Sequence, residues 1–282
     1  LYLNMAMHGI MTLALPFHAF LKASLILLCL LSSMTQAAPS LVIILDDIGN
    51  NHALGKRAVE LPGSLTLAFL PHTPFAARLA EQASKQPANH QKGIMLHAPM
   101  ANETGAKLGP GAMTEGMDKE TLQATLEDNL NSIPHVRGVN NHMGSLLTQQ
   151  QHSMTWVMDV IEQRGLYFVD SLTNPASVAA ETAEKTGIPS AERDVFLDNE
   201  RELGSLVKQF QQALNVARKQ GHVILIGHPY PETLDFLEAI LPTLEEKENI
   251  ELLTADDFLA RKMWLQGAQP TQVSRLQLQL LP

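Results

Sequence analysis

Short apolar runs alternate with longer amphipathic stretches from residue 41 almost to the end of the chain. The first run, at residues 41–45, holds five apolar residues without a polar break, and its centre is β-branched. Such a run favours a strand that is buried on both faces, as in a parallel sheet. Comparable runs predict further strands at residues 64–70, 93–96, 136–139, 166–169, 195–197, 222–226 and 250–253.

The stretches between these runs have the spacing of helices, and several end at a proline or a glycine. They predict helices at residues 51–61, 75–84, 118–133, 149–164, 176–186, 200–220, 232–246 and 255–262. Strand–helix alternation implies parallel strands joined by right-handed crossovers. Since this many repeats exceed what a simple open sheet usually needs, we predict an α/β fold, a distorted (β/α) barrel of seven to eight parallel strands.

The start of the chain lacks this alternation. Lys22 precedes an apolar run at residues 23–31, and small residues follow the run. This is the pattern of a secretory signal peptide, so we expect residues 1–37 to be removed by cleavage after Ala37, with Met11 as a candidate true start. The alternative is that the apolar run is retained as a membrane anchor, although it is shorter than the ~20 residues that a span needs.

Composition narrows the classes of function. The 282 residues carry a formal net charge of −9, and no cluster of Lys and Arg is visible, which argues against a nucleic-acid partner. The single cysteine, Cys29, lies in the leader, so the mature chain has no thiol. We expect one domain at residues 38–264 and a loose tail at residues 265–282. This domain would have no permanent membrane span, and no particular oligomeric state is indicated.

Polar residues follow the apolar runs, at the ends of the predicted strands; they are Asp46, Asp47, His97, His142, Asp170, Asp198 and His228. The carboxyl ends of parallel strands meet at one end of a barrel, where active sites lie. Carboxylates and imidazoles without cysteine suit a divalent ion such as Zn, Mn, Co or Ni. One carboxylate and two imidazoles leave positions open for water and substrate, and a further Asp and His could serve as base and acid.

Each of these residues also has a structural interpretation. Asp47 could cap the helix after the first strand, and Asp198 could cap the helix at residues 200–220. A single histidine is more often packed or hydrogen-bonded than bound to an ion. The chain has no nucleophile elbow of the G-x-S-x-G type, which argues against serine hydrolysis, and no glycine-rich phosphate loop.

Six short motifs occur in a fixed order along the chain: L-D-D-I-G, L-H-A-P-M, N-N-H-M-G-S, F-V-D-S, D-V-F-L-D and I-G-H-P. The ordered set resembles the divergent polysaccharide deacetylase family, within the NodB-like superfamily, from residue 41 to about residue 262. The resemblance implies a distorted barrel, a bound divalent metal and hydrolysis of an N- or O-acetyl group on a sugar. Zinc is the first candidate for the metal.

The resemblance also implies roles for the residues in these motifs. Asp46 matches the position of the general base, and Asp47 matches that of a metal ligand. His97 and His142 would be the other two ligands. His228 looks like the general acid, which would protonate the leaving amine or alkoxide while Asp46 takes the proton of a metal-activated water.

Three further residues of the motifs, Asn141, Ser145 and Asp170, are expected to bind substrate. The chain departs from the usual deacetylase pattern in two ways. The two metal histidines usually sit in one short motif, but here they belong to different strands. The usual arginine-containing substrate motif is not apparent, and Arg193 is a candidate substitute.

We therefore expect a periplasmic, metal-dependent hydrolase that removes acetyl groups from a carbohydrate of the cell envelope, such as peptidoglycan. The alternative is a non-catalytic, metal-containing protein that binds an envelope glycan. A third interpretation is a metallohydrolase for another ester or amide.

Overall fold

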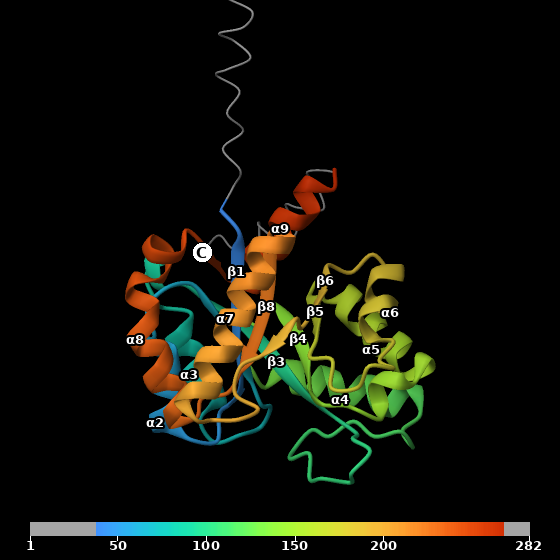
Figure 1. The fold of residues 1–282 in the computed structure, drawn as a ribbon. Coiled ribbons are helices and arrows are strands. Elements are labelled where there is room, and N and C mark those ends of the chain that lie inside the picture. Colours follow the sequence, from blue (N-terminus) through green and yellow to red (C-terminus); the bar gives the residue numbers. More distant parts are fainter. Residues whose placement is uncertain (1–37, 268–282) are drawn as a thin grey trace, which may run out of the picture. The chain divides into compact units, whose positions relative to one another are not determined.

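The computed structural model describes residues 38–267, which form a curled parallel sheet surrounded by helices (Figure 1). The sheet runs in the order β6-β5-β4-β3-β2-β1-β8-β7, and β9 also pairs with β1. The strands are β1 (Ser40–Ile48), β2 (Leu65–Phe69), β3 (Lys92–Met100), β4 (Gly138–Met143), β5 (Tyr167–Asp170), β6 (Ser190–Glu192), β7 (Val195–Phe196), β8 (His222–Gly227) and β9 (Glu251–Leu253).

Helices alternate with these strands, and two short 3-10 helices lie at Ala88–His90 and Leu147–Gln149. The α-helices are α2 (His52–Glu60), α3 (Ala76–Ala83), α4 (Lys119–Asn131), α5 (Gln151–Gln163), α6 (Ala179–Lys185), α7 (Leu203–Gln220), α8 (Pro231–Glu248) and α9 (Ala255–Leu265). Within residues 38–267, none of the helices is both long and apolar enough to cross a bilayer. The predicted leader lies outside the described residues, as does the predicted tail beyond residue 267; α9 continues to Leu265.

The two ends of the sheet are joined by the chain itself. β6 pairs with β5 at one edge, and β7 pairs with β8 at the other. Only Arg193 and Asp194 separate them, and the two backbone N–H groups bond Asp170 O and Ile224 O, each at 2.9 Å. One extended segment therefore changes partners and closes the sheet into a distorted barrel. The predicted fold is confirmed, although β6 was not predicted, because its sequence, S-A-E, has no apolar run.

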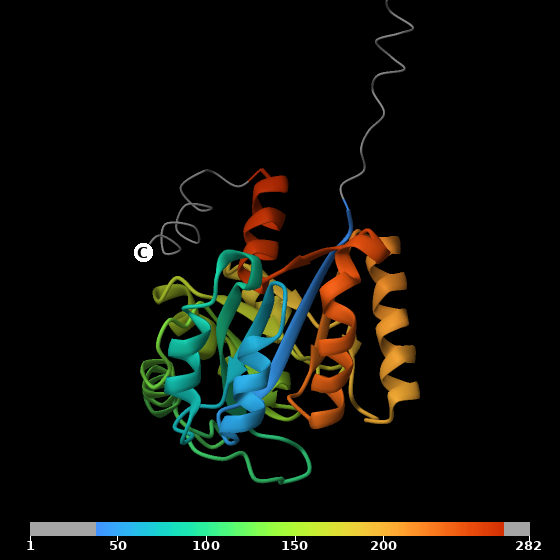
Figure 2. The same cartoon turned by 90° about the vertical axis from the view of Figure 1, so that its left-hand side faces the viewer.

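Residues along β1 alternate between two hydrophobic clusters, as the period of a strand requires. Leu41, Ile43 and Leu45 face outward against the helices, whereas Val42 and Ile44 face the barrel interior. The interior cluster also contains residues of α9, which lies at the end where the strands begin, opposite the loop between β3 and α4 (Figures 1 and 2). Apolar side chains therefore fill the interior of the barrel at this end, and the opposite end is available for a functional site.

Three strands run further than the apolar pattern predicts. β1, β3 and β4 continue to Ile48, Met100 and Met143, so Asp46, Asp47, His97 and His142 lie inside strands rather than in the turns after them. The backbone ladder explains this difference. β3 and β4 stay in register through His97↔Asn140 and Pro99↔His142, because main-chain pairing does not require apolar side chains.

Candidate metal centre and active site

Three side chains from three strands of the sheet bring one ligand atom each to a common point. Asp47 Oδ1 of β1 lies 3.3 Å from His97 Nε2 of β3 and 3.0 Å from His142 Nδ1 of β4. The two imidazole nitrogens are 3.1 Å apart. These are the three residues that the sequence predicts as metal ligands, and they form a group able to hold one metal ion.

The backbone at the end of β1 turns both adjacent carboxylates toward this point. Simple alternation directs Asp46 inward, after Val42 and Ile44, and would direct Asp47 outward. Instead, Asp47 adopts φ +58°, and the register with β2 shifts between Leu45 and Ile48. A non-glycine residue rarely adopts this conformation, and such local strain is found where a side chain must be re-aimed. The bulge therefore allows two consecutive residues to serve one site.

The donor set fits a divalent cation. Asp47 Oδ1 is buried and receives no hydrogen bond from any residue of the described chain, which is costly for a carboxylate oxygen. Ligand atoms that bind one zinc-like ion at about 2.0–2.2 Å are themselves roughly 3 Å apart, as these three atoms are. One carboxylate and two imidazoles would leave coordination positions free, as in catalytic sites.

Asn140 orients two residues of this site at once. Its Nδ2 donates to Asp46 Oδ1 at 2.8 Å, and its Oδ1 lies 2.8 Å from His97 Nδ1. Because an amide oxygen can only accept, His97 must donate from Nδ1, which leaves Nε2 to face Asp47. Such an outer partner fixes the ligand tautomer in many metal sites. Asn140 is fully buried in β4.

Burial and neighbouring groups shift the pKa values of three residues of the site. Burial opposes ionisation of Asp47, but the close imidazoles of His142 and His97 hold the pKa of its carboxyl well below the usual range. Burial lowers the pKa of His97, but Asp46 and Asp47 outweigh it and raise this pKa to about 9. Burial raises the pKa of Asp46 despite the opposing effects of His97, His228 and Asn140. Asp46 is therefore a more basic carboxylate than Asp47.

His228 follows β8 and faces the same site from the other side. Its Nε2 lies 3.9 Å from Asp47 Oδ2, and its Nδ1 lies 3.0 Å from Asp198 Oδ1. Asp198 also accepts the backbone N–H of His228 at 2.6 Å and the hydroxyl of Thr233 at 2.8 Å. Burial lowers the pKa of His228, but the contact with Asp198, followed by Asp46, raises it above its ordinary value.

The proposed helix-capping roles are not what the structure shows. Asp198 binds His228 and does not cap a helix, because α7 begins only at Leu203, after Glu202. The helix after β1 is capped by Asn51, which accepts the N–H of Leu54, so Asp47 is free for the metal centre. Both carboxylates thus belong to the site.

The three residues expected to bind substrate have structural partners instead. Both polar atoms of Asn141 bond main-chain groups, those of Met143 and Ser171. The buried carboxylate of Asp170 accepts from Leu172 N and from the Ser177 hydroxyl. Both side chains hold strand ends and loops, and their roles in binding substrate stay predictions.

Ser145 is also held by a main-chain group, although it is only partly buried. Its hydroxyl accepts the N–H of Glu103, in the long loop between β3 and α4. Arg193 does come to the site, where it donates to the carbonyls of Ser171 and Leu172. Asn140, whose amide contacts Asp46 and His97, was not predicted as a site residue. The sequence signal for it is its position two residues before His142, which puts both side chains on the same face of β4.

The match to known proteins agrees with this geometry. Residues 43–259 match the family described as divergent polysaccharide deacetylase. The chain therefore belongs to the divergent polysaccharide deacetylase family. The resemblance noted in the motifs is confirmed, and it covers all of the site residues described above.

Two relatives of the chain come from bacteria. An uncharacterised protein of Haemophilus influenzae is 32% identical over 217 residues, which cover 77% of this chain and 76% of the relative. The uncharacterised protein YibQ of Escherichia coli K12 is 31% identical over 244 residues, covering 86% of this chain and 74% of YibQ. A solved structure of an uncharacterised protein from Agrobacterium tumefaciens C58 has a TM-score of 0.73 at 21% identity, over 79% of this chain and 90% of that one. At that identity the likeness concerns the fold alone.

Proposed function

We propose that this protein is a periplasmic, metal-dependent hydrolase that removes acetyl groups from a carbohydrate. The observation that carries the proposal is the convergence of Asp47, His97 and His142 on one point, with Asp46 and His228 beside it. This places a ligand set, a candidate base and a candidate acid together. The family supports an acetylated carbohydrate as the substrate class. The periplasmic location rests on the sequence pattern of residues 1–37.

A divalent cation held by Asp47, His97 and His142, for which zinc is our first candidate, would supply a Lewis acid that polarises the acetyl carbonyl and lowers the pKa of water. Asp46 is placed to take the proton of the attacking water. Its raised pKa makes it a stronger base than an ordinary carboxylate, and Asn140 fixes its Oδ1.

His228 is placed to give a proton to the leaving nitrogen or oxygen. Asp198 accepts from its Nδ1, so Nε2 is the atom that faces the site. The raised pKa of His228 keeps a proton available near neutral pH. The base and the acid thus occupy different strands, β1 and the end of β8, on two sides of Asp47.

The test is to measure metal content and acetate release on the chain that starts at Ala38. Acetylated chitooligosaccharides and peptidoglycan fragments would be offered before and after chelation. We expect stoichiometric metal and chelator-sensitive release of acetate. Metal without release from either glycan would overturn the enzyme proposal and leave a non-catalytic glycan-binding protein. The absence of metal would overturn the metal centre itself.

A further inference from the structure

The wall of the barrel is open on one side, at the end where the strands begin. β6 pairs with β5 and β7 pairs with β8, so the chain that crosses at Arg193 and Asp194 joins the two edges of the sheet only at that level. Nearer the strand starts, β6 and the first residues of β8 line one cavity but do not pair with each other. We call this opening the seam; its edges are β6 (Ser190–Glu192) and residues 222–224 of β8.

Both edges of the seam carry main-chain groups that no strand of residues 38–267 uses. On β8, the carbonyl of Ile224 accepts the N–H of Asp194 at 2.9 Å. His222 lies two residues before Ile224, so its main-chain groups point to the same edge, where no backbone partner is found among residues 38–267. On β6, the carbonyl of Ser190 accepts from the Lys262 ammonium, at 3.1 Å, and not from a strand. Strand edges with unused main-chain groups are templates for a further strand.

The cavity in the seam has a volume of about 670 Å³ and lies between β6, β8, α6 and α9. Its inner side is apolar and is made by residues that belong to the interior cluster of the barrel or pack against it: Ala191, Ile224, Phe258, Leu259 and Met263. Because side chains alternate along a strand and Ala191 faces inward, Glu192 faces the outer side. The seam therefore offers apolar contacts on one side and a polar surface on the other.

The outer side of the cavity carries negative charge. Glu184 of α6 and Glu192 of β6 both line it, and no hydrogen bond or ion pair to either carboxylate is found among residues 38–267. Burial raises the pKa of Glu192, and the carboxylates of Asp170 and Asp194 raise it further, although the ammonium of Lys262 opposes them. The carboxylates around Glu192 thus outweigh the one cation near it. This side of the seam is suited to a further positive charge.

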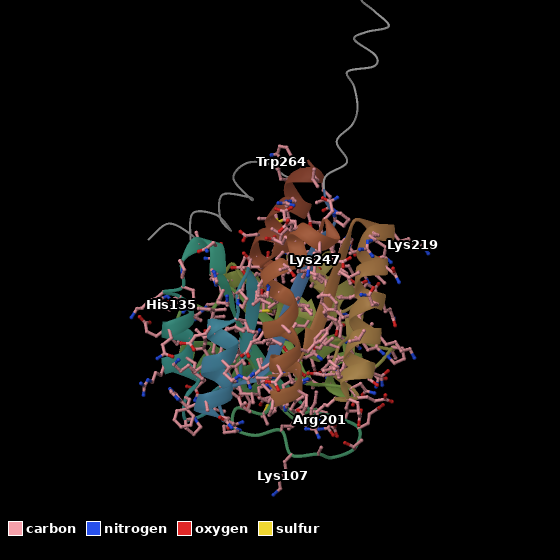
Figure 3. The ribbon with its side chains drawn as sticks, turned by 60° about the vertical axis from the view of Figure 1, so that its left-hand side comes forward. Lys107, His135, Arg201, Lys219, Lys247 and Trp264 are labelled. Atoms are coloured by element: carbon pink, nitrogen blue, oxygen red, sulfur yellow. The ribbon has the colours of Figure 1, made fainter. Side chains whose placement is uncertain are left out.

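The chain leaves α9 at the mouth of this cavity. Gly267, the last residue that the structure describes, lines the cavity together with Gln266. The helix ends there, because Gly267 has φ +79° and donates its N–H to the carbonyl of Trp264 at 3.1 Å. Trp264 lies on the last turn of α9, at the end of the barrel where the strands begin (Figure 3). The residues that follow Gly267 therefore start beside the seam and need no long connection to reach it.

The sequence after Gly267 contains the pattern of a half-buried strand. Residues 275–280 read R-L-Q-L-Q-L, which puts three leucines on one face and Arg275 with two glutamines on the other. Arg275 is the only charged residue at positions 268–282. The two faces of this segment match the two sides of the seam, because the leucines suit the apolar inner side and the guanidinium suits the carboxylates of the outer side.

We infer that residues 275–280 dock in the seam as an added strand between β6 and β8, with their leucines on the inner side and Arg275 against Glu184 and Glu192. The added strand completes the wall of the barrel, supplies main-chain partners to both edges and neutralises the outer side. Glutamine content alone predicts a loose tail, and it is the cavity that gives this segment a place. The inference is independent of the proposed reaction, because the seam lies where the strands begin and the metal centre lies at their carboxyl ends.

The test is hydrogen–deuterium exchange, read at single amides by NMR, on the chain that starts at Ala38. In this chain we expect the amides of residues 275–280 to be protected. Truncation after Gly267 should speed exchange at the seam amides of His222 and Glu192 by at least about tenfold, because it removes their partner strand. Exchange of residues 275–280 at the rate of an unstructured peptide, or seam amides that truncation leaves unchanged, would overturn the inference.

Two pairs of variants test how the segment is oriented. Leu278→Gln puts an amide on the inner side and should release the segment, whereas Leu281→Gln, the matched control just beyond the alternating stretch, should not. Arg275→Glu should also speed exchange at the seam, and Glu192→Arg in the same chain should restore protection. Equal effects of Leu278→Gln and Leu281→Gln, or no restoration by Glu192→Arg, would overturn the proposed docking. Protection that rises with protein concentration would place the segment of a second copy in the seam and would overturn docking within one chain.

Discussion

Asn140 donates to Asp46 from the nitrogen of its amide, and its amide oxygen accepts from His97, so one buried side chain links the proposed base to a candidate metal ligand. The two contacts have different consequences, because one concerns proton transfer and the other concerns the metal. A substitution that keeps one contact and removes the other therefore separates the two roles.

Asn140→Asp should do this. The new carboxylate can still accept from His97 Nδ1, but it can no longer donate to Asp46, and it places a second negative charge beside the base. We expect kcat/KM for acetate release to fall by at least about tenfold, the scale of one lost charge-assisted hydrogen bond. Metal affinity, measured by competition with a chromogenic chelator, should stay within about threefold. Parallel losses of both quantities would contradict separate roles, and Asn140→Ala provides that comparison.

Asp46→Asn should abolish turnover and spare the metal. The amide cannot accept a proton from water, and general-base catalysis is typically worth about 10²–10⁴-fold. The bound metal, measured by elemental analysis, should remain stoichiometric, because Asp47 supplies the carboxylate ligand. His142→Ala is the complementary variant, in which metal affinity should fall more than the about 10–100-fold typical of an outer-shell change. Full metal occupancy in His142→Ala would refute the ligand assignment.

Asp198→Asn should move the alkaline limb of the pH profile of kcat/KM. The contact with Asp198 raises the pKa of His228, so activity that needs protonated His228 is lost as pH rises through that pKa. With the charge removed, the limb should shift to lower pH. An unchanged limb, with kcat reduced at all pH values, would indicate that Asp198 only holds the ring in place.

Asp256, at the far end of the barrel, makes stability depend on pH. Burial raises its pKa from 3.8 to about 6, although the Tyr167 hydroxyl and Arg137 oppose the shift. Between these values the folded protein keeps a proton that the unfolded chain releases. The free energy of unfolding contributed by this group therefore falls as pH rises from about 4 to 6, by about 3 kcal/mol in all.

Asp256→Asn removes this titration and keeps an acceptor for Tyr167. Urea unfolding of both proteins at several pH values should show the wild type losing stability relative to the variant as pH rises through that window. A difference between the two proteins that stays constant with pH would mean that Asp256 has an ordinary pKa in the fold.

The sequence was sufficient to predict the barrel and to single out the three residues of the candidate metal centre, because both depend on strong local signals. Continuous β-branched runs identify buried parallel strands, and Asp or His directly after such a run is rare enough to be noticed. The apolar-run signal misses a strand that is held by main-chain pairing alone, such as β6. It also misses a functional side chain that lies inside a strand rather than after it, such as Asn140. Asn141 is the same residue type in the same motif, so only the alternation of side chains along β4 distinguishes it from Asn140.

The backbone conformation of Asp47 was a second feature that the sequence did not reveal. The positive φ of Asp47 re-aims its carboxylate, and no residue preference marks it, since glycine would be the usual choice.

The number of residues that link β6 and β7 determines which side chains of the following segment face His228. Only Arg193 and Asp194 cross between the two edges of the sheet. After them, Phe196 and Asp198 both contact His228. The residues that alternate with these two, Val195 and Leu197, pack outward. Inserting or deleting one residue there would reverse the faces of this segment, since side chains alternate with a period of two. The aromatic ring and the carboxylate would then leave His228 together. Members of the family that keep the reaction are therefore expected to show no change in the number of residues between β6 and β7.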